Sequence, residues 1–285
     1  MQVRRRACAR EVRLAFRASV ESGNVLLRFI VRVGRESLGL VSTFGAMAIF
    51  FFFGFINIFR RKQIAEIVSH TYSIGARSSL IVMLVGLFTG MVLGLQLFYT
   101  LVKFGSVGAL GSAVSLSLIR ELGPVLTAIM ITARAGSAMA AEIGILRISE
   151  QIDALYTMRI DPVRYLISPR IAAAIISFPI LTAFFDLIGI FGGYISGVLL
   201  LGTNAGTYFY RVQFPVDIVD VRGGFIKALV FAVIVSTICC FQGYFCHMRP
   251  QGFGAKAVGL ATISAVVISC VMILISDYVV TSFLM

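Results

Sequence analysis

Four ionisable residues lie within one apolar run of this sequence. Arg120 and Glu121 open the run, Arg134 lies near its middle and Glu142 near its end, while residues 122–146 are otherwise apolar or small enough to cross a bilayer. Ionisable groups at such depth usually face a protein interior or a wet cavity. Charge held there can bind a headgroup, join helices by buried polar contacts, or carry protons.

The first two of these charges stand at the outer end of the run. Gly123 and Pro124 follow Arg120 and Glu121, and this pair loosens the local helix and can free backbone carbonyls. If this end lines a cavity, Arg120 is placed to meet an anionic lipid headgroup, with Glu121 beside it. The preceding apolar run offers a wall for acyl chains, formed by Leu93, Leu97, Leu101 and Phe104. The alternative is an interfacial Arg120 that snorkels to water and pairs with Glu121.

The other two charges, Arg134 and Glu142, are eight positions apart. They share roughly one helix face but are too distant to pair directly. Each needs a partner elsewhere, and Asp186 and Asp277, which also lie within apolar runs, are candidates by sign. We interpret these four residues as buried polar contacts of a structural core, and favour this over a role in a conformational switch.

A polar segment at residues 147–159 follows the run. It predicts a short helix with Ile152, Leu155 and Met158 on one face and acidic residues exposed. Such a helix could lie on the membrane or dock into a groove on a soluble partner. Its acidic character favours the partner, because anionic lipids repel an acidic surface.

Composition defines the class of protein. The 285 residues are 59% hydrophobic and only 13% charged, as expected of a polytopic α-helical membrane protein. The net charge of +12 arises at the ends of apolar runs and near the N-terminus, so it indicates the anionic inner membrane surface and no nucleic acid. The five cysteines lack a CxxC pair and the two histidines are far apart, so we expect no metal or cofactor. Neither a phosphate loop nor a GxSxG elbow is present, which argues against an enzyme.

Five membrane spans are predicted, at residues 74–102, 113–146, 166–201, 223–245 and 257–283. Residues 1–37 form a basic amphipathic extension, expected on the inner leaflet; a solvated tail and an organelle-targeting segment are the alternatives. Residues 38–62 hold an apolar run with basic residues at both ends, which favours an interfacial elbow helix over a span. The same rule places the N-terminus in the cytoplasm and the C-terminus outside. A row of Gly86, Gly90 and Gly94 could pack inside the bundle or at a homodimer interface.

Two parts of the sequence resemble the MlaE (YrbE) permeases of ABC-type lipid transport systems. One is RELGPVLTAIMITARAGSAMAAEIG, ISEQIDAL and DPVRYLISPR within residues 120–170, and the other is GMVLGLQ at residues 90–96. The resemblance covers residue 43 to the C-terminus. It implies an all-α polytopic membrane protein with an N-terminal interfacial elbow helix and five transmembrane helices. A cytoplasmic coupling helix lies between the second and third, and residues 63–285 form the permease domain.

The resemblance also implies partners and roles. The chain would be a homodimeric subunit without its own cofactor, working with a cytoplasmic ABC ATPase that binds ATP, an MCE-domain lipid-binding protein and in some systems a STAS-domain subunit. Phospholipid would move between the bacterial inner membrane and a periplasmic carrier to maintain outer-membrane asymmetry; plastid relatives import lipid, so an organelle envelope is possible. The residues implied to couple to the ATPase are Ser149, Glu150, Gln151, Asp153, Leu155 and Met158. The alternative function is an ion-coupled secondary transporter that uses Glu121, Glu142, Asp186 and Asp277, against which the absence of internal repeats counts.

Overall fold

The computed structural model describes residues 34, 45–52, 54, 64–248 and 254–284. It divides into two units, Met1–Ile49 and Phe50–Met285, and the second holds all the helices discussed below. The basic extension predicted at residues 1–37 lies outside the described residues, apart from residue 34. Of the predicted elbow at residues 38–62, residues 45–52 and 54 are described as helical and the rest lies outside the described part.

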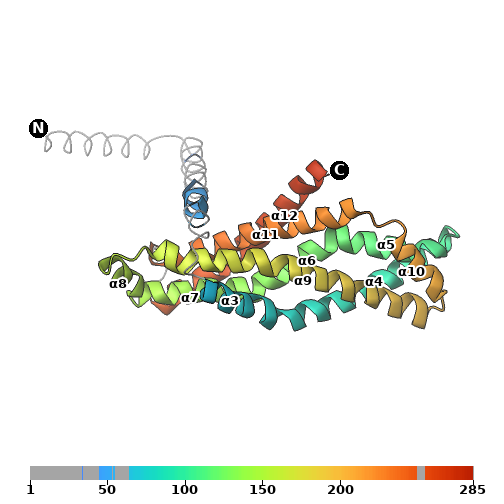
Figure 1. Cartoon of the computed structure of the whole chain (residues 1–285), viewed down its shortest axis with the longest axis horizontal. Helices are drawn as coiled ribbons and strands as arrows, with labels where there is room; N and C mark the ends of the chain where they lie inside the picture. The colour runs from blue at the N-terminus through green and yellow to red at the C-terminus, as the bar shows by residue number, and fades with distance from the viewer. Residues whose placement is uncertain (1–33, 35–44, 53, 55–63, 249–253, 285) are drawn as a thin grey trace, which may run out of the picture. The chain divides into compact units, whose positions relative to one another are not determined.

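Five helical segments of the described chain are long and apolar enough to cross a membrane, and no strand is found among the described residues. The segments are Ile64–Lys103, Val107–Ile148, Val163–Leu200, Ile218–Tyr244 and Ala255–Leu284. The predicted fold class and the number and order of spans are confirmed (Figure 1). The largest difference in boundary is at the first segment, which already begins at Ile64 because the polar residues at 69–73 do not interrupt the helix.

Several segments combine α-helix with π-helical turns. The first consists of α3 (Ile64–Thr71), the π-turn η3 (Tyr72–Ala76) and α4 (Arg77–Lys103). The second consists of η4 (Val107–Ala109), α5 (Leu110–Ser117), the π-turn η5 (Leu118–Leu122), α6 (Gly123–Ile131), the π-turn η6 (Thr132–Gly136) and α7 (Ser137–Ile148). The third consists of the π-turn η7 (Val163–Ile167), α9 (Ser168–Tyr194) and the π-turn η8 (Ile195–Leu200). The fourth and fifth are single helices, α11 (Ile218–Tyr244) and α12 (Ala255–Leu284).

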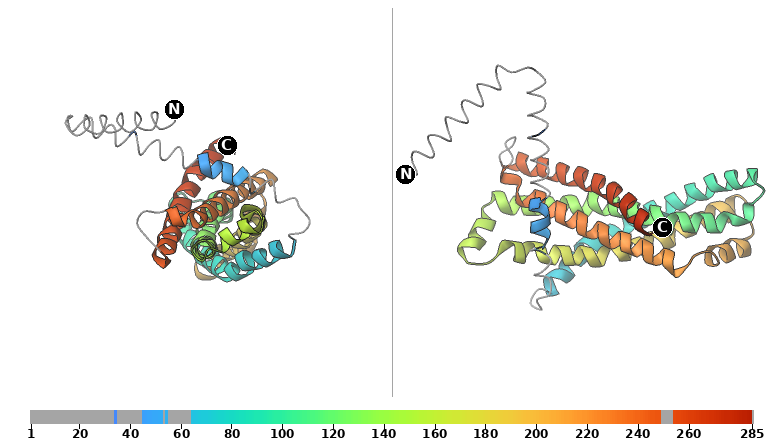
Figure 2. Two further views of the ribbon diagram at one scale, coloured as in Figure 1. Left: turned by 90° about the vertical axis from the view of Figure 1, so that its left-hand side faces the viewer. Right: turned by 90° about the horizontal axis from the view of Figure 1, so that it is seen from above.

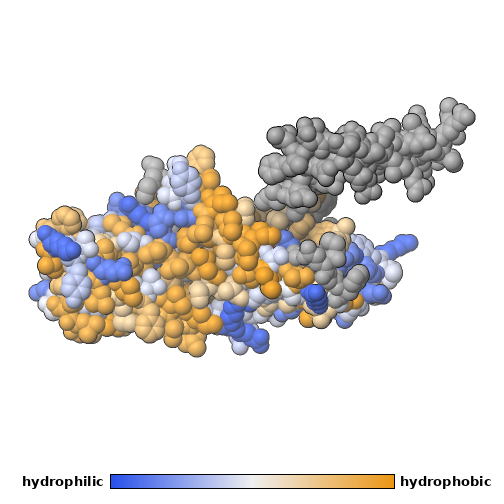
Figure 3. All heavy atoms as spheres, turned by 180° about the vertical axis from the view of Figure 1, so that it is seen from behind, coloured by the Kyte–Doolittle hydropathy of each residue, from blue (hydrophilic) through white to orange (hydrophobic). Residues whose placement is uncertain are grey.

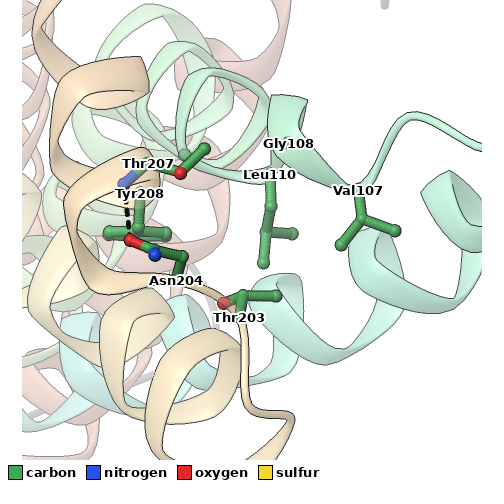
Figure 4. Close-up of a pocket in the computed structure, with 8 residues that line it drawn as sticks. Val107, Gly108, Leu110, Thr203, Asn204, Thr207 and Tyr208 are labelled. Carbon is green, nitrogen blue, oxygen red and sulfur yellow. Dashed lines mark hydrogen bonds between the residues drawn. The ribbon is translucent and has the colours of Figure 1, made fainter.

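Short helices join these segments at opposite ends of the bundle. α8 (Gln151–Thr157) follows the second segment and α10 (Ala205–Gln213) follows the third, and Figure 1 shows them at the two ends. η9 (Cys246–Met248) follows α11. Asn204 caps α10, since its side-chain oxygen accepts hydrogen bonds from the backbone N–H groups of Gly206 and Thr207 (Figure 4), which satisfies two of the donors that a helix start leaves unpaired. The bundle therefore has one end marked by α8 and another marked by α10.

The predicted glycine row packs inside the bundle. A Cβ atom on Gly90 would overlap the carbonyl oxygen of Gly189 on α9, and one on Gly86 would press on the backbone of Phe185. A Cβ atom on Gly94 would overlap the hydroxyl of Ser196 and press on the backbone of Gly193. Small residues therefore let α4 and α9 approach backbone to backbone, so this row joins two helices of one chain.

The interior and the surface of the bundle are both apolar. Phe178, Phe185 and Phe231 are fully buried, and the left view of Figure 2 shows the helices of the bundle end-on. Large hydrophobic side chains also cover the outside, and Figure 3 shows them over the middle of one face with hydrophilic residues toward its ends. An apolar exterior of this kind suits hydrocarbon as solvent.

Candidate functional site

Lys227 lies at the centre of an ionic network near the α10 end of the bundle. Only 4% of its side chain is exposed, and its Nζ lies 2.6 Å from Oε2 of Glu121 and 3.1 Å from Oδ1 of Asp277. The contact with Glu121 is a hydrogen bond, whereas that with Asp277 is an ion pair without hydrogen-bond geometry. One ammonium group on α11 thus holds η5 on one side and α12 on the other.

The backbone beside this lysine explains its place. Lys227 Nζ also donates to the carbonyl oxygen of Arg120 at 2.9 Å. In a regular helix this carbonyl would accept from the N–H of residue 124, but residue 124 is proline and has none. Arg120 lies in the π-turn η5, directly before Gly123 and Pro124. The Lys227 side chain therefore supplies this carbonyl with a donor in place of the N–H that Pro124 lacks.

Arg120 makes its ion pair with a residue one hundred positions away. Its Nε lies 2.8 Å from Oδ1 of Asp220, with 43% of the Arg120 side chain exposed. Asp220 also belongs to the capping box at the start of α11, where its carboxylate accepts from the backbone N–H of Asp217. The alternative in which Arg120 pairs with Glu121 is wrong, because Glu121 faces Lys227 instead.

A pocket of about 450 Å³ opens on this network. Arg120, Glu121, Asp217, Asp220 and Lys227 supply its charged lining, and the rest comes from α11 and α12. The structure therefore brings Arg120 and Glu121 to one cavity, as the sequence predicted.

The apolar wall predicted for this cavity lies elsewhere. Leu93, Leu97 and Leu101 pack against the hydrophobic core of the bundle, and Phe104 is 77% exposed. None of them lines the pocket that holds Arg120 within the chain.

Arg134 and Glu142, two charges in the later part of the second segment, have partners that the sequence did not suggest. Glu142 Oε2 lies 3.2 Å from Nη2 of Arg170, whose side chain is 7% exposed. Arg134 donates from Nη1 to the hydroxyl of Ser78 at 2.9 Å. Arg134 therefore reaches a neutral partner, and neither of the two aspartates proposed by sign.

Asp186 stands apart from these pairs. Its Oδ1 is buried with no hydrogen-bond partner in the described part of the chain, and a Cβ on Gly123 would collide with it. Gly123 thus leaves space for this carboxyl group between α9 and α6.

At the other end of the bundle, α8 forms an exposed connecting helix. Glu150 precedes it with a φ of 58°, a left-handed conformation that turns the chain out of α7. Ile152 is fully buried and anchors α8. Tyr156 and Met158 are 53% and 60% exposed, so an apolar surface is presented outward.

The other residues predicted to couple to the ATPase differ in their contacts and their exposure. Ser149 donates to the carbonyl of Ile145 at 2.9 Å and so ends α7. Gln151 and Glu150 are exposed, and Leu155 is half-buried. All of the predicted coupling residues except Leu155 are therefore exposed.

Arg147 fastens α8 to the end of α11. It donates from Nη1 to Asp153 at 2.7 Å and from Nε to Nδ1 of His247 at 3.1 Å, and it lies over the Tyr244 ring. The hydroxyls of Tyr156 and Tyr244 are 2.7 Å apart. Partial burial, and next the Arg147 charge, lower the pKa of His247 below its usual value, which favours the neutral ring that accepts the Arg147 hydrogen bond.

The described residues contain no group of three or more His, Cys, Asp or Glu that could hold a metal ion. Cys239, Cys240 and Cys246 carry thiols buried in the bundle, as small core residues would. Paired charges at one end of a five-span bundle and an exposed helix fastened at the other are features of a polytopic helical membrane protein whose embedded charges have partners.

Comparison with known proteins identifies the family. The family described as Permease MlaE matches residues 67–283. A probable ABC transporter permease protein of Rickettsia felis is 40% identical over 258 residues, which is 90% of this chain and 98% of the relative. The intermembrane phospholipid transport system permease protein MlaE of Haemophilus influenzae is 38% identical over 260 residues, 90% of this chain and 98% of the relative. The chain belongs to the MlaE permease family. It is a transport subunit of ABC type, and its five apolar helices and family together indicate a multi-pass inner-membrane protein.

Three functional residues escaped the sequence analysis. Lys227, Arg170 and Asp220 complete the ion pairs described above. A signal existed for Lys227, since it is the one basic residue inside the predicted fourth span and a lysine at such depth requires partners. Arg170 and Asp220 lie near span ends, where charge is ordinary.

Proposed function

We propose that this chain is the permease subunit of an ATP-driven transporter that moves phospholipid between the inner membrane and a periplasmic MCE-type carrier, maintaining outer-membrane asymmetry. The subunit works as a homodimer with a cytoplasmic ABC ATPase, with or without a STAS-domain protein. The observation that carries the proposal is the match of nearly the whole chain to a relative named as an intermembrane phospholipid transport permease.

The α8 helix is the proposed contact with the ATPase. Tyr156 and Met158 offer exposed apolar side chains, and a small exposed apolar surface beside charged residues suits a groove on a soluble protein. The contacts of Arg147 and Tyr156 with the end of α11 join this helix to the bundle. A push on α8 is therefore delivered to α11 directly, and α11 carries Lys227 near its other end.

The pocket around Arg120 is the proposed headgroup site, and its charges refine which headgroup fits. Two cations and three carboxylates line it, and Arg120 is already paired with Asp220. A purely anionic group would face excess negative charge. A zwitterionic headgroup, with an ammonium as well as a phosphate, is better matched by this arrangement.

The ion-coupled alternative receives no support from the pairing. Glu121 and Asp277 both contact Lys227, and Glu142 contacts Arg170. Three of the four carboxylates considered as proton carriers thus contact a cation of the same chain.

The test uses two matched substitutions at opposite ends of the bundle. Met158→Asp places a charge on exposed α8, and Phe214→Asp makes the same type of change beside α10, where Phe214 is 71% exposed. We expect Met158→Asp to reduce ATPase co-purification and ATP-dependent lipid transfer in proteoliposomes by about tenfold, equivalent to roughly 1.4 kcal/mol of binding. Phe214→Asp should leave ATPase association unchanged.

Three results would contradict the proposal. One is a wild-type chain that retains no ATPase under mild detergent. The second is lipid transfer that runs on a proton gradient without ATP. The third is equal loss of ATPase association in both variants, which would show that any charge on an exposed apolar residue disturbs the protein.

A further inference from the structure

A second charged pocket lies in the half of the bundle nearer α8. Its volume is about 150 Å³, and its polar lining consists of His70, Ser73, Arg77, Arg134 and Glu142. Drug-sized ligands use cavities of about 300–1,000 Å³, so this pocket suits one compact polar group. It is separate from the cavity around Arg120 and shares no lining residue with it.

Two π-turns position the arginines of this pocket. Arg77 directly follows η3 and Arg134 lies within η6. A π-turn adds a residue to the helical turn and so redirects the side chains around it, and such turns are frequent at functional sites. The two helical segments that contribute arginines to the pocket therefore both contain a π-turn next to or at the arginine.

These arginines have no carboxylate partner among the described residues. Arg134 donates to the neutral hydroxyl of Ser78, and Arg77 lies 5.9 Å from the ring centroid of Tyr72. Glu142, the one carboxylate in the lining, is paired with Arg170. Each guanidinium carries five N–H donors, so most donors on two cations remain available to a ligand.

The position of Arg77 along its helix indicates where that ligand comes from. α4 contains 27 residues and its charged residues are its first and last, Arg77 and Lys103. A helix of that length spans roughly 40 Å, against about 30 Å for the hydrocarbon core of a bilayer. The apolar stretch between these two charges is therefore long enough to cross the hydrocarbon core, which favours a place for Arg77 near the headgroup layer on the α8 side.

We propose that this pocket binds a phosphate group, held by the guanidinium groups of Arg77 and Arg134 with Ser73 beside them. Planar guanidinium groups bind phosphate oxygens in pairs of parallel hydrogen bonds. The group can come from a phospholipid headgroup in the adjacent leaflet or from free phosphate. The inference does not rest on the proposed transport function, because binding at this pocket is measured without ATPase or transfer.

The experiment measures lipid retention by native mass spectrometry of the full-length protein in detergent. Phosphatidylglycerol is compared with diacylglycerol of the same acyl chains, which lacks the phosphate. We expect Arg77→Gln with Arg134→Gln to weaken phosphatidylglycerol binding by at least about tenfold, since two charge-assisted contacts are lost. Diacylglycerol binding should not change. Lys103→Gln, the same change at the other end of α4, is the matched control and should bind both lipids as the wild type does.

Two further variants and a competition measurement separate loss of phosphate binding from other causes. Ser78→Ala removes the hydrogen-bond partner of Arg134 but leaves both charges, and should retain phosphatidylglycerol. Arg77 is exposed and its side chain makes no hydrogen bond to the described residues, so Arg77→Gln alone should fold. It should still weaken phosphatidylglycerol binding by at least about threefold, even if the double variant does not fold. Inorganic phosphate that competes with the lipid would identify a site for any phosphate, and failure to compete would restrict it to lipid.

The inference is overturned by any of three outcomes. The double variant, or Arg77→Gln, could bind phosphatidylglycerol within about twofold of wild type. Diacylglycerol could be lost in parallel with phosphatidylglycerol, which would show a general loss of lipid contact. Lys103→Gln could cause the same loss as the pocket variants, which would assign the effect to net charge.

Discussion

Replacing Lys227 by methionine isolates the buried cation of the outer network. Methionine keeps a similar length and packs in apolar surroundings, but it removes the positive charge from between Glu121 and Asp277. Both carboxylates then remain in place without their counter-ion, and the carbonyl oxygen of Arg120 loses its donor. The change therefore acts on charge and hydrogen bonding with little loss of volume.

The size of the effect follows from exposure. Removing one partner of a fully buried ion pair costs about 3–5 kcal/mol. Glu121 and Asp277 retain side-chain exposures of 39% and 20%, so water relieves part of this cost, and we expect a loss of about 2–3 kcal/mol. Adding Glu121→Gln and Asp277→Asn removes the uncompensated charges. This triple variant should recover all but about 1 kcal/mol, which is the cost of the unpaired Arg120 carbonyl.

Buried thiols provide the assay. Cys239, Cys240 and Cys246 carry buried thiols, so a dye that fluoresces on reaction with thiols reports their exposure as the protein unfolds. The midpoint temperature should fall by several degrees in Lys227→Met and return most of the way in the triple variant. Lys256→Met, a matched change of an exposed lysine at the start of α12, should leave the midpoint unchanged.

Two outcomes would refute this reasoning. If Lys227→Met is as stable as the wild type, the carboxylates are either protonated or hydrated in the native protein and the lysine does not neutralise them. If the triple variant is no more stable than the single one, the cost lies in packing around residue 227 and not in uncompensated charge. Either result would also remove the reason to treat the network as a unit.

Two further predictions concern packing and pH. Gly90→Ala should destabilise the protein by more than about 2 kcal/mol, as overpacked cores do, because the new Cβ would overlap the backbone of Gly189. Gly259→Ala, where a Cβ would meet nothing within 4 Å, should be neutral or stabilising. Thermal unfolding in the thiol assay compares the two variants, and equal midpoint temperatures would contradict the close packing at Gly90. The pKa of His247 lies below its usual value, so its contribution to stability is full above about pH 6.5 and is lost as pH falls through the lowered native pKa. Arg147→Gln should raise that pKa in an NMR titration, and an unchanged value would exclude Arg147 as a cause.

The spans were predictable because each depends on local composition alone. Residues 223–245 and 257–283 are so apolar that any window along them indicates a membrane helix, and the structure moves their ends by only a few residues. The polar residues at 69–73 caused the start of the first span to be predicted at residue 74, whereas the helix begins at Ile64. Its hydroxyl groups bond to the helix itself, as Thr71 does to the carbonyl of Ile67, so polarity there ended neither the helix nor its packing.

The short helix at residues 151–157 was also predictable, but its free surface was not. Spacing correctly placed Ile152 on an apolar face. It could not show that this residue alone is buried whereas Met158 is exposed, because that depends on which residues of α7 and α11 lie beneath. The same limit applies to Asp153, whose exposed carboxylate is occupied by Arg147.

The ion pairs were beyond sequence reasoning for a different physical cause. Arg120 and Asp220, like Lys227 and Glu121, are separated by about one hundred residues, and such pairs form only after helices have chosen their neighbours. Matching by sign failed because a membrane interior offers neutral partners as well, as Ser78 does for Arg134. The backbone offered a better clue. Pro124 removes the N–H that would bond to the Arg120 carbonyl in a regular α-helix, so a side-chain donor was one way to satisfy this carbonyl, and Lys227 was the basic residue in the predicted fourth span.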